Sequence, residues 1–514
     1  MMDCFSVKLF LQLAMPTEDS SVSDQTRIRH ALEALGYGSV VFPLHIIQKL
    51  YPLCRNCNFA ITVTLVYRET DWVVAAVEAG DQARHHYGLA VDYGSTTMVM
   101  ELVDMRSGAV IGQAKAVNGQ TVYGTDILTR ITYSLEEPSH MDNLQQVTLD
   151  TFRDLLLELT DQTGIDAASC AVMIVSGNTT MIHFLLRLNA WTVFASPFAP
   201  VTAEPGWIWG SSLGMEFAGL LYFIPAASNY VGGDIVSGLL KAGIHEKEET
   251  GLFFDIGTNG ELVIGNREWL VAGAGAAGPA LEGYISRYGM RAAPGAIDRV
   301  SIQENRLHFT TIENQKPIGI CGSGIIDLLA QMLLAGWMSR SGDLQPQVTE
   351  RIRFLEEEQQ YAVIYADEAQ SQTGAPLFFT QTDIHQYMDT KAAAYTMVEC
   401  LLETAGCTMD EIAECCLSGA FCAHSDLESA ITIGMFPDID RKKYSAFANT
   451  SLDGARTLLL DRTKLQVLHA LTEKIYCIQF ASIPDFLIRM QAAKFFPHTD
   501  IDRYPTVKEK LSSP

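Results

Sequence analysis

The sequence predicts a mixed α/β fold with two similar lobes, preceded by a smaller α/β domain. The chain has 514 residues, which is more than one hydrophobic core usually organises. Its composition, with 48% hydrophobic and 19% charged residues, is typical of a folded globular protein. A pattern of three apolar strands followed by helices starts near residue 87 and starts again near residue 251, which indicates an internal duplication.

The first 25 residues have the character of an extended linker. Residues 1–25 contain Pro16 and a cluster of serine and aspartate residues, which disfavour regular structure. The apolar run at 5–15 contains Lys8 and has no basic leader or small-residue cleavage site, so we expect a strand or linker and not a signal peptide.

Residues 26–84 have the pattern of a small α/β middle domain. A helix is predicted at 26–35, and a second one after Pro43, a residue that suits the first turn of a helix. Two strand-like runs at 60–67 and 72–77 follow, with a polar turn between them.

The rest of the chain is predicted to form the two lobes, at 87–230 and at 231–514, the second with a C-terminal extension. In each lobe an apolar strand ends in an aspartate and two more strands follow before the helices. The predicted strands are 88–92, 98–103 and 109–116 in the first lobe, and 252–255, 261–264 and 269–272 in the second.

Charge and cysteine content restrict the function classes. The net charge of −24 and the pI of about 4.8 oppose binding to nucleic acid or to an anionic membrane. No run of about 18 uncharged apolar residues is present, so no membrane-spanning helix is expected. The eleven cysteines are scattered, as expected for reduced thiols in the cytoplasm.

Two related turns carry the predicted chemistry. Asp92-Tyr-Gly-Ser-Thr-Thr97 and Asp255-Ile-Gly-Thr-Asn-Gly260 each follow an apolar strand, about one domain's length apart. Polyphosphate needs backbone N–H donors that approach closely, and glycine with small hydroxyl residues permits this. We therefore expect phosphate contacts from Gly94, Ser95, Thr96, Thr97, Gly257, Thr258, Asn259 and Gly260.

The two aspartates of these turns are the candidate catalytic residues. A carboxylate is repelled by phosphate, so Asp92 and Asp255 should face Mg²⁺ or its water ligands. Of the two, Asp255 is our choice for the residue that orients or deprotonates an attacking water molecule.

The order of these turns, followed by a glycine turn that opens a helix, resembles the ATPase superfamily of acetate and sugar kinases, Hsp70 and actin. The resemblance implies a two-lobed actin-like ATPase fold, built from duplicated ribonuclease-H-like domains, with ATP and Mg²⁺ in its cleft. Segments that resemble the adenosine-side turns are Leu417-Ser-Gly-Ala-Phe421 and Cys321-Gly-Ser-Gly-Ile-Ile-Asp327. They add Gly322, Ser323, Gly324, Gly419, Ala420 and Phe421 as nucleotide-side candidates.

Further motifs resemble the ATPase part of the reductive activators of corrinoid proteins. This resemblance covers roughly residues 87–514, and the first 85 residues resemble the linker and middle domain of the same family. The motifs are Ser176-Gly-Asn-Thr-Thr-Met-Ile-His183, Tyr230-Val-Gly-Gly-Asp-Ile235, Ala277-Gly-Pro-Ala-Leu-Glu-Gly283, Gly289-Met-Arg-Ala-Ala-Pro-Gly-Ala-Ile297, Ile320-Cys-Gly-Ser-Gly-Ile-Ile-Asp327 and Asp426-Leu-Glu-Ser-Ala-Ile-Thr-Ile-Gly434.

The narrower resemblance implies an ATP-dependent activator that promotes reduction of a partner corrinoid protein from Co(II) to Co(I), and it suggests a homodimer. Members of this family usually carry an iron–sulfur module bound by cysteines, and no such cysteine cluster occurs here. We therefore expect no iron–sulfur cluster in this chain, and either a separate electron donor or a different function for this homologue.

The cysteines near predicted turns have ordinary and special interpretations. Cys54 and Cys57 form the tightest pair and are expected as plain thiols near a helix end. Cys422 replaces the last glycine of the family pattern Gly-Ala-Phe-Gly, where a thiol would crowd or tune an adenine pocket. A cluster shared between subunits by Cys321 and Cys422 is the alternative to buried free thiols, which we favour.

Four more residues are candidates for the cleft. Asn178 is one of them, and Asp234 either faces the cleft or caps a helix. Glu282 either contacts ribose or Mg²⁺ or favours a helix start electrostatically. Lys391 either reaches the nucleotide or, as we prefer, is solvated.

Three histidines are expected to have ordinary roles. His183 is predicted to be a core histidine, and His85 and His86 to be linker residues and not cobalt ligands.

Two other functions fit the same fold. A small-molecule kinase for a sugar or acyl group would need a carboxylate base beside an acceptor pocket, and no sequence motif indicates such a base. A nucleotide-binding scaffold with little turnover is the third possibility, because a fold does not determine function.

Overall fold

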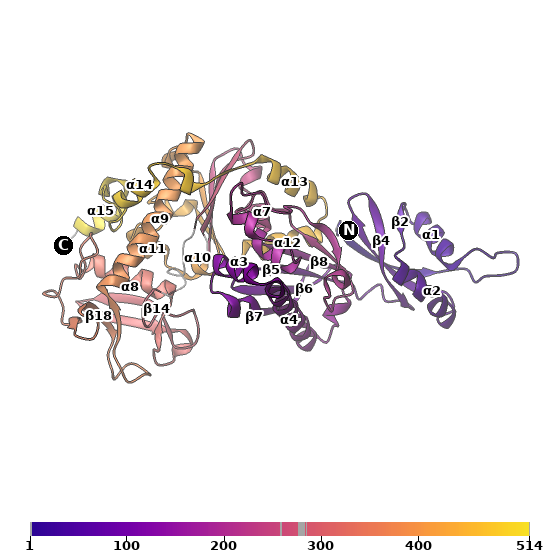
Figure 1. The fold of residues 1–514 in the computed structure, drawn as a ribbon, viewed down its shortest axis with the longest axis horizontal. Helices are drawn as coiled ribbons and strands as arrows, with labels where there is room; N and C mark the ends of the chain where they lie inside the picture. Colours follow the sequence, from indigo (N-terminus) through magenta and orange to yellow (C-terminus); the bar gives the residue numbers. More distant parts are fainter. Residues whose placement is uncertain (1–2, 258–259, 276–282, 284, 513–514) are drawn as a thin grey trace. The chain divides into compact units, whose positions relative to one another are not determined.

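The computed structural model describes residues 3–257, 260–275, 283 and 285–512. Within these residues the chain divides into two compact units. Unit 1 comprises residues 1–241 and 450–474, and unit 2 comprises residues 242–449 and 475–514. Figure 1 traces the elements of both units.

The N-terminal part of unit 1 is a four-stranded sheet with two helices. The sheet order is β1-β3-β4-β2, and α1 and α2 lie together beside β4 (Figure 1). Ser23 caps α1 by accepting a hydrogen bond from the backbone N–H of Thr26. The elements are β1 (Ser6–Gln12), α1 (Asp24–Ala34), β2 (Val40–Val41), α2 (Leu44–Asn56), β3 (Ala60–Arg68) and β4 (Asp71–Ala79). Because β1 pairs with β3 along its whole length, residues 6–12 are part of this sheet and not an extended linker.

The main sheet of unit 1 has the strand order β7-β6-β5-β8-β10-β9. Its first three strands form an antiparallel meander, and β8 lies parallel to β5. The strands are β5 (Tyr87–Tyr93), β6 (Thr97–Asp104), β7 (Val110–Val117), β8 (Val172–Gly177), β9 (Gly206–Trp209) and β10 (Leu220–Phe223). The helices are α3 (Ile127–Glu136), α4 (Pro138–Thr163), α5 (Thr179–Leu185), α6 (Trp191–Phe194), α7 (Gly233–Ala242), α12 (Thr450–Leu460) and α13 (Lys464–Lys474).

Two helices cover opposite faces of β5. Successive side chains of a strand point to opposite faces, so Asp92 and Tyr93 face different layers. Tyr93 is fully buried, and its ring packs against Phe152 of α4. Asp92 instead meets the N-terminus of α12, where Ser451 contacts it.

The main sheet of unit 2 repeats the order and direction of the first five strands of the unit 1 sheet, and its sixth strand lies at the other edge. Its order is β21-β20-β11-β12-β13-β22, with an antiparallel meander of β11, β12 and β13 and with β20 parallel to β11. The strands are β11 (Gly251–Ile256), β12 (Gly260–Gly265), β13 (Leu270–Gly275), β20 (Glu414–Ser418), β21 (Tyr444–Phe447) and β22 (Ile475–Ile478). The predicted duplication is thus confirmed by strand order and direction.

Unit 2 has two additional three-stranded sheets and several helices that complete its core. The sheets are β15-β14-β16 and β17-β18-β19. The strands are β14 (Ala296–Gln303), β15 (Arg306–Thr311), β16 (Gly319–Ile320), β17 (Ile352–Leu355), β18 (Gln360–Ala366) and β19 (Leu377–Thr380). The helices are α8 (Gly322–Leu334), α9 (Gln381–Ala405), α10 (Ala420–His424), α11 (Leu427–Thr432), α14 (Phe486–Ala492) and α15 (Pro505–Ser512).

The compact units differ from the predicted lobe bounds in two places. Residues 450–474 follow β21 of unit 2 in the sequence but pack on unit 1, where α12 lies against β5 and β8. The sequence-based prediction assigned residues 450–474 to the second lobe, because nothing in the sequence marks the point at which the chain returns to unit 1. Residues 231–241 also belong to unit 1.

Candidate functional site

The Asp92 turn lies at the end of β5, and three of its backbone carbonyl groups accept hydrogen bonds from Asn118 and Arg130. Asn118 donates its side-chain N–H to the Gly94 carbonyl (2.9 Å) and its backbone N–H to the Thr96 carbonyl (2.9 Å). Arg130, which is fully buried, donates to the Ser95 carbonyl (2.6 Å).

These contacts orient the peptide groups of the turn. In a trans peptide the N–H points opposite to the C=O, so the N–H groups of Ser95, Thr96 and Thr97 point away from Asn118 and Arg130. The sequence indicated the turn, but Asn118 and Arg130 were missed because their contacts depend on tertiary folding.

Glycine is required at position 94 by a close backbone approach. A Cβ there would lie 2.4 Å from the Thr97 carbonyl oxygen, and a contact that short is not tolerated. Ser95, Thr96 and Thr97 of the same turn are all half-buried. Glycine at position 94 is therefore a steric requirement of the turn itself.

The Asp255 turn occupies the equivalent place at the end of β11. Asp255 is half-buried, and its Oδ2 accepts a hydrogen bond from Ser418 Oγ (3.2 Å). Gly257 is exposed and Gly260 begins β12. Two other predicted members of this turn, Thr258 and Asn259, lie outside the described residues.

The two aspartates have matching neighbours. Asp92 lies opposite Ser176 on the parallel strand β8, and Asp255 lies opposite Ser418 on the parallel strand β20. Both serines are buried and both precede a glycine. The duplication therefore places one carboxylate and one buried hydroxyl at the same point of each sheet.

Gly419 continues this arrangement in unit 2. Its φ is +102°, a value that favours glycine, and a Cβ would lie 2.6 Å from the Ile256 carbonyl oxygen. Ala420 and Phe421 follow in α10, but their side chains lie outside what the structure describes. Cys422 is buried within the core of unit 2, and burial raises the pKa of its thiol, with a smaller contribution from Asp255.

The second glycine turn opens α8. Gly324 packs tightly on β14, since a Cβ would lie 2.4 Å from the Ile297 carbonyl oxygen. Ser323 donates a hydrogen bond to the Asp298 carbonyl (3.1 Å), and the buried Cys321 donates to the Ile297 carbonyl (3.3 Å). Gly322 is the first residue of α8. Cys321 and Cys422 are thus both buried thiols, the interpretation preferred from sequence.

A polar cavity of about 400 Å³ lies beside α8 and α11. One wall carries Asp327, which is almost fully buried and whose pKa is raised by burial. Its Oδ2 accepts from the Val300 N–H (3.3 Å). None of the nucleotide-side residues predicted from sequence lines this cavity. Its lining residues are Arg299, Val300, Ser301, His308, Phe309, Thr310, Asp327, Gln331, Asp426 and Ser429.

Asn178 and Asp234 lie near each other in unit 1. Asn178 caps α5 by accepting from the Thr180 N–H (2.9 Å), and Asp234 lies in the first turn of α7. A Cβ added to Gly232 would lie 2.7 Å from Asp234 Oδ1 and 2.8 Å from Asn178 Cα, which brings these segments together. Glu282, another cleft candidate, lies outside the described residues.

Lys391 is neither solvated nor directed at a nucleotide turn, which corrects both interpretations from sequence. The side chain is fully buried, and burial lowers its pKa to about 7. Its Nζ donates to the carbonyl oxygens of Ala493 (2.8 Å) and Phe495 (2.7 Å), and also to that of Pro497. Lys391 therefore anchors the segment that follows α14.

The histidines have structural roles. The Nδ1 of His183 donates to the Thr179 carbonyl (2.7 Å) and its Nε2 accepts from the Val201 N–H (3.1 Å), so it is a neutral core histidine. His86 is buried and hydrogen bonds through Nε2 to Ser6 Oγ (2.7 Å), and burial lowers its pKa to about 4. His85 is exposed. The sequence predicted no ligand role for any of them.

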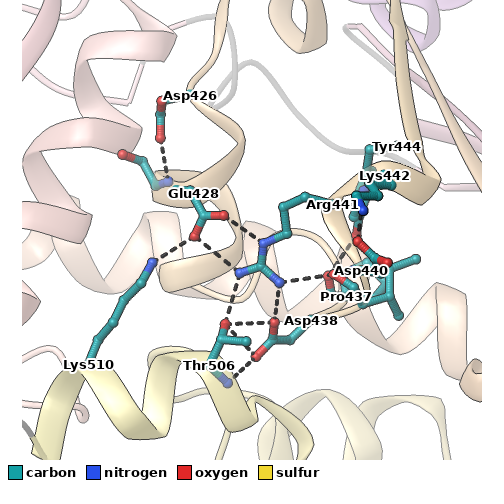
Figure 2. Close-up of polar contacts among 12 residues, drawn as sticks. Asp426, Glu428, Pro437, Asp438, Asp440, Arg441, Lys442, Tyr444, Thr506 and Lys510 are labelled. Atoms are coloured by element: carbon teal, nitrogen blue, oxygen red, sulfur yellow. Dashed lines mark hydrogen bonds and ion pairs between the residues drawn. The ribbon is translucent and has the colours of Figure 1, made fainter.

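The segment after the Gly419 turn is held by ion pairs around Arg441. As Figure 2 shows, the Arg441 guanidinium lies between Glu428 of α11 and Asp438, and it also reaches Thr506 of α15. The Asp438 side chain is fully buried, whereas that of Glu428 is 47% exposed. Lys510 of α15 adds a second contact to Glu428 (2.7 Å). The C-terminal helix is thereby tied to α11.

Replacing Glu428 with glutamine should lower stability in a pH-dependent way. Hydrogen bonding to Arg441 lowers the pKa of Glu428 from 4.5 to about 2, so the folded state favours the ionised form. The stabilisation is fully present above about pH 4.5 and disappears as the pH falls towards 2. Because Glu428 is partly exposed, solvent screening limits the loss at pH 7 to about 1 kcal/mol.

Denaturant unfolding of the wild type and of Glu428→Gln from pH 7 to pH 3 tests this. The difference between their free energies of unfolding should shrink as the pH falls. A constant difference over this range would contradict the assignment.

Metal and membrane features were sought in the same part of the chain. Over the described ranges, no group of three or more His, Cys, Asp or Glu side chains is placed to hold a metal ion. None of the helices in those ranges combines the length and the low polarity needed to cross a membrane.

Comparison with known families matches three consecutive regions. The RACo linker region matches residues 2–84, the RACo middle region matches 87–247, and the C-terminal domain of RACo, the ASKHA domain, matches 249–508. This chain belongs to the RACo family. The RACo linker region matches residues 2–84, and the RACo middle region matches residues 87–247. Our names for 1–25, a linker, and for 26–84, a middle domain, therefore differ from the names of the matching RACo regions.

Individual relatives agree with the RACo assignment. The solved structure of a reductive activator for corrinoid, iron-sulfur protein is 34% identical, covers 98% of this chain and 81% of its own, and has a TM-score of 0.90. The corrinoid activation enzyme RamQ of Eubacterium limosum is 28% identical, over 81% of this chain and 71% of RamQ. The [Co(II) methylated amine-specific corrinoid protein] reductase of Methanosarcina barkeri is 22% identical, over 76% of this chain and 73% of its own. The family and the actin-like fold predicted from motifs are confirmed.

Proposed function

We propose that this chain is an activator of a corrinoid protein that uses ATP to promote reduction of Co(II) to Co(I). The observation that supports this most directly is the agreement in fold with a reductive activator over 98% of the chain. Two other relatives named for corrinoid activation or corrinoid-protein reduction match most of the chain. We further propose that electrons come from a redox centre outside these 514 residues, because the eleven cysteines form no tight cluster.

The two equivalent turns are proposed to bind Mg·ATP. Each presents a half-buried carboxylate at a strand end, and oxygen ligands of this type suit Mg²⁺ and its water molecules. In the Asp92 turn, the N–H groups of Ser95 and Thr96 point opposite to the carbonyls that Asn118 and Arg130 hold, an orientation suited to phosphate. When bound, Mg²⁺ would neutralise charge on the phosphates, and Asp92 and Asp255 would hold it directly or through water.

The proposed role of ATP is thermodynamic coupling. Reduction to Co(I) is unfavourable, so the nucleotide must favour the reducible form of the corrinoid protein through contacts that differ between the two states of the complex. The acidic chain is suited to a partner protein and not to nucleic acid. We also propose that the protein acts as a homodimer in the cytoplasm.

A small-molecule kinase is the second candidate function, because the ASKHA domain is shared with such enzymes. Phosphoryl transfer to a panel of sugars and carboxylic acids would support it. If none of these compounds is phosphorylated and ATP-dependent corrinoid reduction is observed, the kinase function is excluded.

The deciding experiment follows the cobalt spectrum of a Co(II) corrinoid protein under a strong reductant, with and without ATP and this chain. We expect Co(I) to appear only when the chain, ATP and Mg²⁺ are all present. Tight ATP binding without any change in the cobalt spectrum would overturn the activator function. Complex formation without hydrolysis or reduction would favour a nucleotide-binding scaffold.

A further inference from the structure

Asp92 is contacted by a serine from a distant part of the sequence. Ser451 Oγ lies 2.8 Å from Asp92 Oδ1, and it also lies 2.9 Å from Ser176 Oγ. A carboxylate can only accept, so Ser451 donates its hydrogen to Asp92 and its oxygen faces the Ser176 hydroxyl. Ser176 Oγ also lies 3.1 Å from the Gly233 carbonyl oxygen, so its single hydrogen is donated either to that carbonyl or to Ser451. Two buried hydroxyl groups thus lie in line with the Asp92 carboxylate, and Ser451 is the one that donates to it.

Ser451 is held in place by tight helix packing. It is the second residue of α12, and its carbonyl accepts a hydrogen bond from Ser237 Oγ of α7 (2.7 Å). A Cβ on Gly454 would lie 2.1 Å from the Ser237 carbonyl oxygen, so the backbones of α12 and α7 touch. Ser176, Ser237 and Ser451 are all buried, which restricts their rotation. The position of the Ser451 hydroxyl is therefore set by the place of α12 on unit 1.

The corresponding contact in unit 2 is built differently. There Ser418, on the strand next to Asp255, donates directly to the carboxylate. In unit 1 the equivalent strand residue, Ser176, contacts Ser451, which in turn donates to Asp92. One contact of the Asp92 carboxylate thus comes from α12, and residues 450–474 are joined at both ends to segments of unit 2.

We propose that Ser451 is a positioning residue for Asp92, which fixes the rotation of the carboxylate and so sets how it meets Mg²⁺ on the nucleotide. This inference rests on the proposed binding of Mg·ATP. It adds a residue from α12 to the predicted Asp92 turn. It also makes the metal-binding geometry of Asp92 sensitive to any displacement of α12.

The test compares nucleotide affinity with and without the metal. Dissociation constants for ATP are measured by calorimetry in excess Mg²⁺ and again in EDTA, for the wild type, Ser451→Ala and Ser451→Thr. Loss of a hydrogen bond to a charged group should weaken Mg·ATP binding about tenfold in Ser451→Ala. Binding in EDTA should stay unchanged, and Ser451→Thr should restore most of the metal dependence.

Thr457→Ala is the matched control, because its hydroxyl donates only within α12, to the Asp453 carbonyl. Ser176→Ala is a second variant, expected to shift the metal dependence in the same direction by about threefold. Equal metal dependence in Ser451→Ala, Ser176→Ala and the wild type would overturn the inference while leaving ATP binding intact. A wild type that binds no ATP would overturn the proposed function, and the inference with it.

Discussion

Replacing Asp255 or Asp92 with asparagine should lower the rate of ATP-dependent Co(I) formation by about 10²-fold or more. Asparagine keeps the shape of the side chain and a hydrogen-bond acceptor for Ser418 or Ser451, but it removes the negative charge. Mg²⁺ prefers charged oxygen ligands, so both the affinity for Mg·ATP and the turnover should fall. The measurement is the initial rate of Co(I) appearance at saturating corrinoid protein, with ATP affinity measured in parallel.

Two surface aspartates serve as controls, one in each unit. Asp142 is exposed and Asp389 is half-buried, and they form ion pairs with Arg187 and Lys494; their asparagine variants should keep the wild-type rate. If Asp255→Asn slows the reaction and Asp92→Asn does not, the two turns are equivalent in structure but not in function. If neither slows it, the proposed nucleotide site is wrong.

Replacing Lys391 with methionine should lower the free energy of unfolding of unit 2 by about 3 kcal/mol. Methionine fills a similar volume but cannot donate a hydrogen bond. The carbonyl oxygens of Ala493, Phe495 and Pro497 would then lose their shared donor in a buried setting. The expected signature is faster hydrogen exchange in the residues after α14, together with a lower midpoint of denaturant unfolding.

Lys494→Met is the matched control for this substitution. Lys494 lies in the same segment, but its ion pair with Asp389 is partly exposed to solvent, so we expect a change below 1 kcal/mol. A Lys391→Met variant that is no less stable than Lys494→Met would show that the three carbonyl groups find other donors. ATP affinity should be nearly unchanged in Lys391→Met, because the lysine lies in an anchoring contact and not in a predicted nucleotide turn.

The sequence by itself determined the architecture and the two turns that define the candidate site. Apolar strands that end in Asp92 and Asp255, each followed by a glycine turn and two more strands, predicted a duplicated α/β fold, and the matching order of five strands in each sheet confirms it. Such features are local: the strand pattern comes from alternating burial, and Gly94 is needed because its own turn leaves no room for a Cβ. The motif resemblances likewise led to the RACo family.

Only the tertiary structure decided which distant residues support these turns. Ser451 reaches Asp92 because residues 450–474 return to unit 1, and no local pattern marks that return. Arg130 and Asn118 hold the Asp92 turn, and Lys391 is buried against carbonyl groups a hundred residues away in the chain. A lysine or serine in a helix has the same local pattern whether it faces solvent or a buried acceptor. The choice is made by long-range packing, where an unpaired polar group would cost more than the hydrogen bond contributes.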